Sequence, residues 1–150
     1  MNTESAITDL TVEQTLDFLT DKRFGRLAVS LDGRPDIFPI NFAVHANNID
    51  DVVAYIRTSP GNKLFATATG SYLALETDHI DGNIATSAVV YGTGRRVEHH
   101  KELSLVDTLD LDAWIAVRKP EVIAIDIEHI SGRRFVLGPS PETTITEAPD

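Results

Sequence analysis

Four side chains able to hold an anion surround one turn in the middle of the chain. Arg57 and Thr58 end the apolar stretch VVAYIRT, and Asn62 and Lys63 follow the turn SPG, where a helical pattern begins. Guanidinium, ammonium and hydroxyl groups are strong donors to a phosphate, and the free N–H groups of a helix start add to them. The sequence therefore predicts a phosphate site at this turn.

The residues before this turn predict a hairpin beside it. An apolar run from Leu27 to Leu31 is followed by Asp32-Gly33, a dipeptide typical of the type I′ turn. The returning strand, about 36–44, contains Pro39, which has no N–H for strand pairing. Pro39 therefore indicates an edge, a bulge or a ligand on that side. A phosphate held beside a sheet suggests a nucleotide-like cofactor.

The remaining pattern is mainly that of strands joined by turns. Thr11 and Gln14 have the spacing of a capping box, which predicts a helix start. Further strands are predicted at 52–57, 71–79, 84–97, 122–130 and 133–137, and helices at 12–21, 62–68 and 102–109, the last with an extension over 112–118. Gly92 and Gly94 indicate bends or bulges. We expect a mainly β protein with a few short helices, built as an antiparallel barrel.

Composition limits the function classes. The chain has 150 residues, a net charge of −10 and no cysteine, which disfavours a nucleic-acid partner and excludes disulfides and thiolate chemistry. No apolar run is long enough to span a membrane, and the N-terminus lacks the pattern of a secretion signal, so we expect a cytoplasmic protein. We predict a flexible lead-in over 1–10, one domain over 11–138 and a disordered tail over 139–150.

The order of several motifs resembles a known family. GRLAVSLDGRPDIFPINF followed by YIRTSPGNKL resembles the pyridoxamine 5′-phosphate oxidase-like flavoproteins, especially the branch that includes nitroimidazole reductase-like proteins. The later segments LALETDHID, SAVVYGTGRRV and HISGRRFVLG fit the same branch, so the resemblance covers roughly residues 9–138. It implies a split β-barrel of antiparallel, Greek-key-like strands that binds FMN at a homodimer interface.

The resemblance also implies which residues contact the cofactor. The residues matching the phosphate site are Arg57, Thr58, Asn62 and Lys63, those matching the strand along the isoalloxazine ring are Pro39, Ile40, Asn41 and Phe42, and Ser87 matches a flavin contact from the barrel. The chain departs from many relatives in two places. Ala85-Thr86 stands where they carry Gly-Trp, and Tyr91 stands where they carry Arg.

These residues predict an FMN-dependent oxidoreductase that takes electrons from a reduced nicotinamide or another donor and passes them to a small organic acceptor or oxygen. No acid–base dyad is placed by spacing, so no catalytic side chain is assigned. The adjacent pair His99-His100 does not share a helix face, and no metal site is predicted. Two alternatives remain: a non-catalytic flavin- or haem-binding module, and a deazaflavin-dependent reductase on the same fold.

Overall fold

The computed structural model describes residues 6–59, 63–111 and 121–138. The elements along the described chain are β1 (Ile7–Asp9), α1 (Val12–Thr20), β2 (Phe24–Leu31), β3 (Arg34–Asn41), β4 (Ala43–Asn48), β5 (Asp51–Thr58), α2 (Lys63–Ala68), β6 (Tyr72–Asp81), β7 (Ile84–Arg96), α3 (His100–Asp107) and β8 (Glu121–Val136). Among the described residues no helix is long and apolar enough to cross a membrane.

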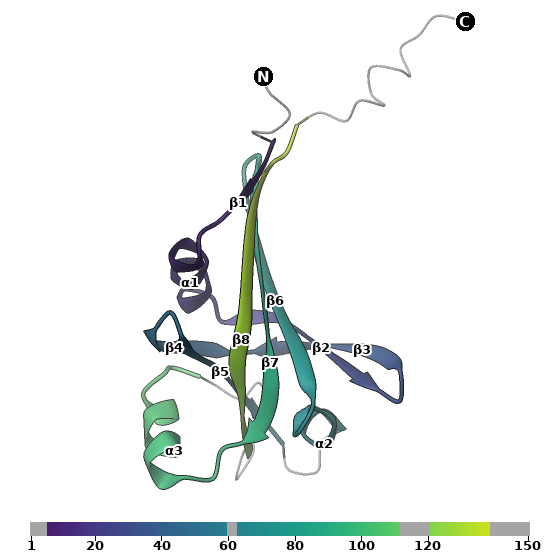
Figure 1. The fold of residues 1–150 in the computed structure, drawn as a ribbon, viewed down its shortest axis with the longest axis vertical. Helices are drawn as coiled ribbons and strands as arrows, with labels where there is room; N and C mark the ends of the chain where they lie inside the picture. Colours follow the sequence, from purple (N-terminus) through teal and green to yellow (C-terminus); the bar gives the residue numbers. More distant parts are fainter. Residues whose placement is uncertain (1–5, 60–62, 112–120, 139–150) are drawn as a thin grey trace, which may run out of the picture.

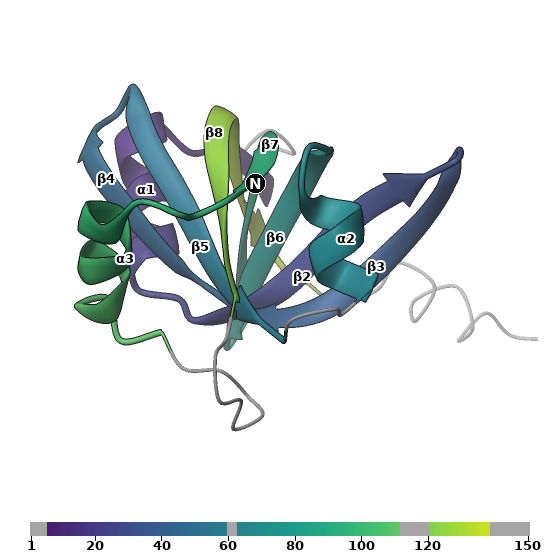
Figure 2. The ribbon, with the colours of Figure 1, turned by 90° about the horizontal axis from the view of Figure 1, so that it is seen from below.

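All eight strands belong to one antiparallel sheet, as the sequence predicted. The strand order is β3-β2-β6-β7-β8-β5-β4, and β1 pairs with β8 outside this path. The long strands β6, β7 and β8 run side by side, while the β2–β3 hairpin projects to one side and α1 and α3 lie on the other (Figure 1). Helix α2 lies beside the hairpin and β6 (Figure 2). Strand β3 is therefore an edge strand, in agreement with the interpretation of Pro39.

Two local predictions are confirmed by backbone geometry. The Thr11 side chain accepts a hydrogen bond from the Gln14 N–H while the Gln14 side chain accepts one from the Thr11 N–H, so the capping box starts α1. Asp32 and Gly33 have φ angles of 52° and 77°, and they join β2 to β3. Because both central residues of a type I′ turn need positive φ, Asp-Gly closes this hairpin with little strain.

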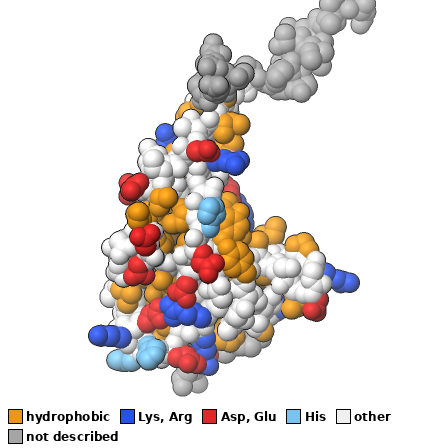
Figure 3. All heavy atoms as spheres, viewed as in Figure 1, with side chains coloured by type: hydrophobic (Ala, Val, Ile, Leu, Met, Phe, Trp, Pro, Cys, Tyr) orange, Lys and Arg blue, Asp and Glu red, His pale blue; other side chains and the backbone are white. Residues whose placement is uncertain are grey.

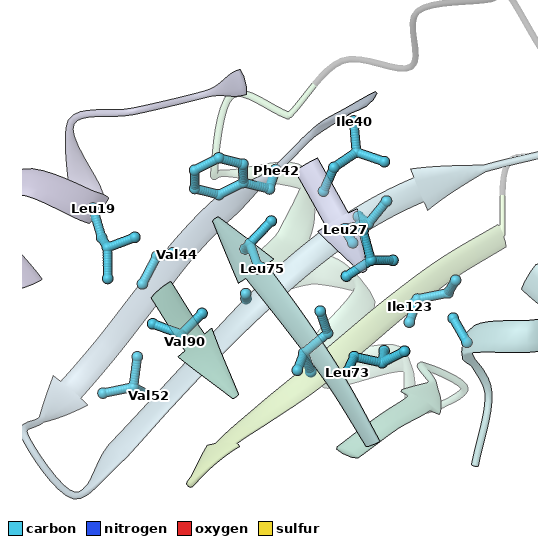
Figure 4. Close-up of a cluster of buried hydrophobic side chains, with 14 of the residues drawn as sticks. Leu19, Leu27, Ile40, Phe42, Val44, Val52, Leu73, Leu75, Val90 and Ile123 are labelled. Atoms are coloured by element: carbon cyan, nitrogen blue, oxygen red, sulfur yellow. The ribbon is translucent and has the colours of Figure 1, made fainter. Parts of the chain in front are cut away.

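The main core fills the space inside the curved sheet. Side chains from α1, β2, β4, β5, β6, β7 and β8 meet there, with Leu19, Leu27, Phe42 and Ile123 fully buried (Figure 4). Helix α3 covers a second, smaller cluster that contains Tyr55, Val106 and Ala124. Strand β5 is thus buried on both faces, which explains its nearly continuous apolar sequence.

Several boundaries differ from the sequence prediction. The strand predicted over 36–44 is two strands, β3 and β4, separated at the buried Phe42, whose N–H donates to the Arg23 carbonyl and not to a neighbouring strand. The strands predicted at 122–130 and 133–137 are one strand, β8. Residues 7–9, within the predicted lead-in, pair with β8. The predicted extension over 112–118 and the tail over 139–150 lie outside the described residues.

Candidate functional site

The structure places the predicted phosphate residues around the segment between β5 and α2. Thr58 is the last residue of β5 and is buried, with 6% of its surface exposed. Lys63 is the first residue of α2, and its side chain is 69% exposed. Asn62 lies outside the described residues. Of the three predicted phosphate ligands that the structure describes, Lys63 is therefore the most accessible to a molecule arriving from solvent.

Arg57 points to the α3 side of the sheet. Side chains alternate along a strand, so Arg57 shares a face with Tyr55, whereas Thr58 shares the core-facing side of Ile56. One Arg57 terminal nitrogen donates to Asp107 Oδ1 at 3.0 Å. Its Nε is buried and has no hydrogen-bond partner among the described residues. That Arg57 and Lys63 act together on one phosphate stays a prediction.

A pocket of about 730 Å³ lies between the β2–β3 hairpin and α2. Its described lining residues are Val29, Leu31, Asp32, Arg34, Pro35, Asp36, Lys63 and Thr67. Lys63 Nζ lies 3.6 Å from Asp36 Oδ2 across this pocket, and the Ile37 N–H donates to Asp36 Oδ1 at 2.9 Å. The pocket therefore joins the start of α2 to the strand predicted to lie along a flavin ring.

The predicted ring-binding strand divides its side chains between core and solvent. Ile40 and Phe42 are buried in the main core, so only their backbone groups could contact a ligand. Pro39 is exposed on the opposite side of β3, and Asn41 is half-buried. Among the described strands β3 stands at the end of the strand order, so one of its edges faces away from the rest of the sheet. Its edge could therefore bond the polar rim of a planar ligand.

Ser87 lies on the same outer face of the sheet as Pro39. The strand pairing can be followed across the sheet. Pro39 on β3 pairs with Arg26 on β2, and Arg26 pairs with Glu76 on β6. Glu76 pairs with Val89 on β7, and Ser87 lies two residues before Val89 on the same strand. Paired residues share a face, and so do residues two apart on a strand. Two strands, β2 and β6, lie between the two positions, so Ser87 is on the same outer face as Pro39 but well away from the β3 edge.

Charged groups cross this outer face between Pro39 and Ser87. Arg26 Nη1 lies 2.8 Å from Glu76 Oε1 and 3.1 Å from Asp78 Oδ2. Burial and the nearby Asp78 raise the pKa of Glu76 above its ordinary value, while the hydrogen bond to Glu76 raises the pKa of Arg26. Two carboxylates thus share one guanidinium beside Ser87, whose cross-strand partners are Asp78 and Arg133.

A second polar cluster holds α3 against the sheet. Both terminal nitrogens of Arg95 donate to Glu102 at 2.7 Å, the Tyr55 hydroxyl donates to Glu102 at 2.7 Å, and Arg95 Nε donates to Asp126 at 2.7 Å. The hydrogen bond from Arg95 lowers the pKa of Glu102, while burial raises the pKa of Tyr55. These groups satisfy one another, which is typical of a structural connection between elements.

The sequence interpretation missed the carboxylates beside the predicted cations. Asp36 lies by Lys63, and Asp107 lies by Arg57. Their separation in sequence from the cations hides both pairs, although Asp36 does stand on the strand that was predicted to carry a ligand. No cluster of three or more His, Asp or Glu side chains suited to a metal occurs in the described part of the chain.

Comparisons with known proteins agree with this architecture. The FAD binding protein from Mycobacterium smegmatis is 30% identical, with a TM-score of 0.77 over 87% of this chain and 100% of that chain. A candidate pyridoxamine 5′-phosphate oxidase from Corynebacterium glutamicum is 33% identical, with a TM-score of 0.78 over 93% of this chain and 99% of that chain. No curated protein matches the chain. The split-barrel fold is therefore confirmed.

The narrower branch is not settled by these matches. A candidate 5-nitroimidazole antibiotic resistance protein from Bacteroides thetaiotaomicron is only 13% identical, with a TM-score of 0.63 over 86% of this chain and 87% of that chain. At this identity the likeness shows the fold alone, and the nitroimidazole reductase-like branch stays a prediction. The family model for pyridoxamine 5′-phosphate oxidase, by contrast, matches residues 11–134. The chain belongs to the pyridoxamine 5′-phosphate oxidase family.

Proposed function

We propose that this protein is a flavoprotein oxidoreductase that binds a flavin nucleotide between the β3 edge and the start of α2. Lys63 would hold the phosphate nearest the ribityl chain, a group that FMN and FAD share. The β3 backbone around Pro39 and Asn41 would contact the ring. Ser87 lies on the outer face of β7, with β2 and β6 between it and β3, and remains a candidate contact for flavin on that face. Thr58, Asn62 and Arg57 remain candidate phosphate contacts, and Ile40 and Phe42 would contribute backbone groups only.

The observation that carries this proposal is the contact between Lys63 and Asp36 at 3.6 Å. It brings the two sequence motifs, which are far apart along the chain, to opposite sides of one pocket of about 730 Å³. A flavin nucleotide has a planar ring at one end and a phosphate nearby, so it needs a strand edge and a cation within one molecular length. The β3 edge and Lys63 meet that requirement, and the M. smegmatis relative is named an FAD binding protein.

Bound flavin would supply the redox chemistry, accepting electrons from a reduced nicotinamide or another donor and giving them to a small organic acceptor or oxygen. The protein's own residues would bind, orient and shield it. No described side chain near the pocket needs to act as an acid or base in this proposal. The closely held Arg26, Glu76 and Asp78 would set the charge on the sheet face beside the ring.

We also propose that the outer sheet face pairs with a second copy of this chain. Ile37, Tyr72 and Ile80 are 65%, 56% and 63% exposed. Ile37 pairs with Ala28, and Ala28 pairs with Ala74 on β6, so these three side chains share one face of the sheet. Tyr72 and Ile80 are on the same strand at even spacing from Ala74, so their side chains lie on that face as well. Large apolar side chains gathered on one face favour a partner. Light scattering should give twice the mass of one chain, and a stable monomer mass at micromolar concentration would contradict the dimer.

The visible absorption spectrum of the purified protein tests the proposed function. After incubation with FMN or FAD and removal of free ligand, we expect a yellow protein with flavin bands that bleach on addition of a reduced nicotinamide. Bound flavin that resists donors and acceptors would support a binding module in place of an enzyme. A colourless protein that retains neither flavin would contradict the proposal, and a Soret band or uptake of deazaflavin alone would favour haem or the deazaflavin coenzyme.

A further inference from the structure

The carboxylate of Asp36 is fixed beside the cation that would hold the flavin phosphate. The Ile37 N–H donates to one Asp36 oxygen at 2.9 Å, and the other oxygen lies 3.6 Å from Lys63 Nζ. The backbone hydrogen bond favours this position of the carboxylate in the pocket lining. In this arrangement a phosphate that contacts Lys63 also lies close to a negative charge.

The pocket as a whole also lacks a surplus of positive charge. Its charged lining residues in the described chain are two cations, Arg34 and Lys63, and two carboxylates, Asp32 and Asp36. Basic and acidic side chains lie together at the outer end of the β2–β3 hairpin (Figure 3). Such a balanced lining gives a second negative charge on the ligand little net attraction, because that charge meets Asp36 as well as Lys63.

The two common flavin nucleotides differ in this respect. The terminal phosphate of FMN is a monoester, which carries roughly −1.5 to −2 charges at pH 7. Each phosphate of FAD is esterified on both sides and carries a single charge. In addition, Arg34 lines the same pocket as Lys63 and offers a separate cation to the second phosphate of FAD.

We propose that Asp36 makes this pocket select FAD over FMN, an inference that rests on the proposed flavin site. Asp36 is then a specificity-determining residue. It lowers the affinity for a doubly charged phosphate more than the affinity for a singly charged one. The extra charge on FMN is at most about one unit. At about 4 Å from the carboxylate in a well-hydrated pocket, one unit corresponds to about a fivefold change in affinity.

The test is to measure dissociation constants of FAD, FMN and riboflavin for the wild type and for Asp36→Asn. The amide keeps an oxygen for the Ile37 N–H, so the fold of β3 is preserved. We expect Asp36→Asn to lower the ratio of the FMN dissociation constant to the FAD dissociation constant about fivefold, chiefly because FMN binds more tightly. The dissociation constant of riboflavin should not change. The change in the ratio should shrink at high salt, because ions screen charges at an exposed pocket.

Asp81→Asn is the matched control, since it removes the same charge at the β6–β7 hairpin, away from this pocket (Figure 1). Asp81→Asn should leave the ratio of the FMN and FAD dissociation constants at the wild-type value. The proposal is overturned if both nucleotides bind and Asp36→Asn leaves the ratio of their dissociation constants unchanged. It is also overturned if Asp36→Asn changes the affinity for riboflavin by the same factor as the affinity for FMN. If neither nucleotide binds the wild type, the proposed function itself fails, which is a separate result.

Discussion

Replacing Lys63 by Met should weaken the binding of FMN and FAD by about 1.5–3 kcal/mol, or roughly 10- to 100-fold. Lys63 is an accessible cation of the pocket between the β2–β3 hairpin and α2, at the start of the helix, and its ammonium group would form a charge-assisted hydrogen bond to the flavin phosphate. Met keeps most of the apolar stem but removes the charge. Riboflavin has no phosphate, so its affinity should stay within about twofold of the wild-type value. Fluorescence titration measures all three ligands.

Lys101→Met provides the matched control for this experiment. Lys101 is an exposed lysine on α3, so the substitution removes the same charge from a different surface. It should leave the affinity for all three flavins unchanged. An equal loss of riboflavin affinity in Lys63→Met would mean that the substitution damages the pocket, and unchanged nucleotide affinity would remove Lys63 from the phosphate site.

Replacing Gly92 by Ala should lower the free energy of unfolding by about 3 kcal/mol or more. The register of β7 and β8 shifts between Tyr91 and Gly92, which brings the two backbones very close there. A Cβ at Gly92 would overlap the carbonyl group of Asp126. Backbone atoms in the middle of a sheet cannot move aside as the end of a flexible side chain can, so the β7–β8 pairing must separate locally. Urea unfolding followed by circular dichroism measures the loss.

Gly138→Ala separates this steric effect from the general effect of replacing a glycine. A Cβ at Gly138 meets no atom within 4 Å, and its φ is not in the positive range. The control should therefore unfold at the same urea concentration as the wild type, within about 0.5 kcal/mol. If Gly92→Ala were as stable as Gly138→Ala, the close approach of β7 to Asp126 would be wrong.

Local signals in the sequence predicted most of the sheet. Thr11 with Gln14 and Asp32-Gly33 each specify a backbone conformation through their own side chains or their tolerance of positive φ, so these features could be predicted without knowing the fold. Gly92 was correctly predicted to mark a bulge. Apolar segments bounded by turn residues located β5, β6 and β7 to within a residue or two.

Features that depend on distant partners were not predictable in the same way. Ser131-Gly132 resembles a turn, but β8 continues through it. Gly132 is needed because Thr15 of α1 packs directly against its Cα, leaving no room for a larger side chain. The break between β3 and β4 at Phe42 also involves distant partners, since the core that buries the Phe42 ring comes from other elements.

The candidate site shows the same division between local and distant information. Lys63 was identified from its motif and lines a pocket beside β3, as expected of a phosphate ligand. The pairing of Lys63 with Asp36 and of Arg57 with Asp107 could not be read from spacing, because each pair joins elements that are brought together only by folding. The roles of the predicted cofactor contacts, including Asn62 and Ser87, stay predictions.

A crystal structure of the protein grown with a flavin nucleotide would show directly where the phosphate binds. We expect electron density for the ribityl phosphate within hydrogen-bond distance of Lys63, with the ring system against the outer edge of β3. A flavin bound elsewhere, with Lys63 and Asp36 still facing each other across a pocket that holds only solvent, would contradict this expectation.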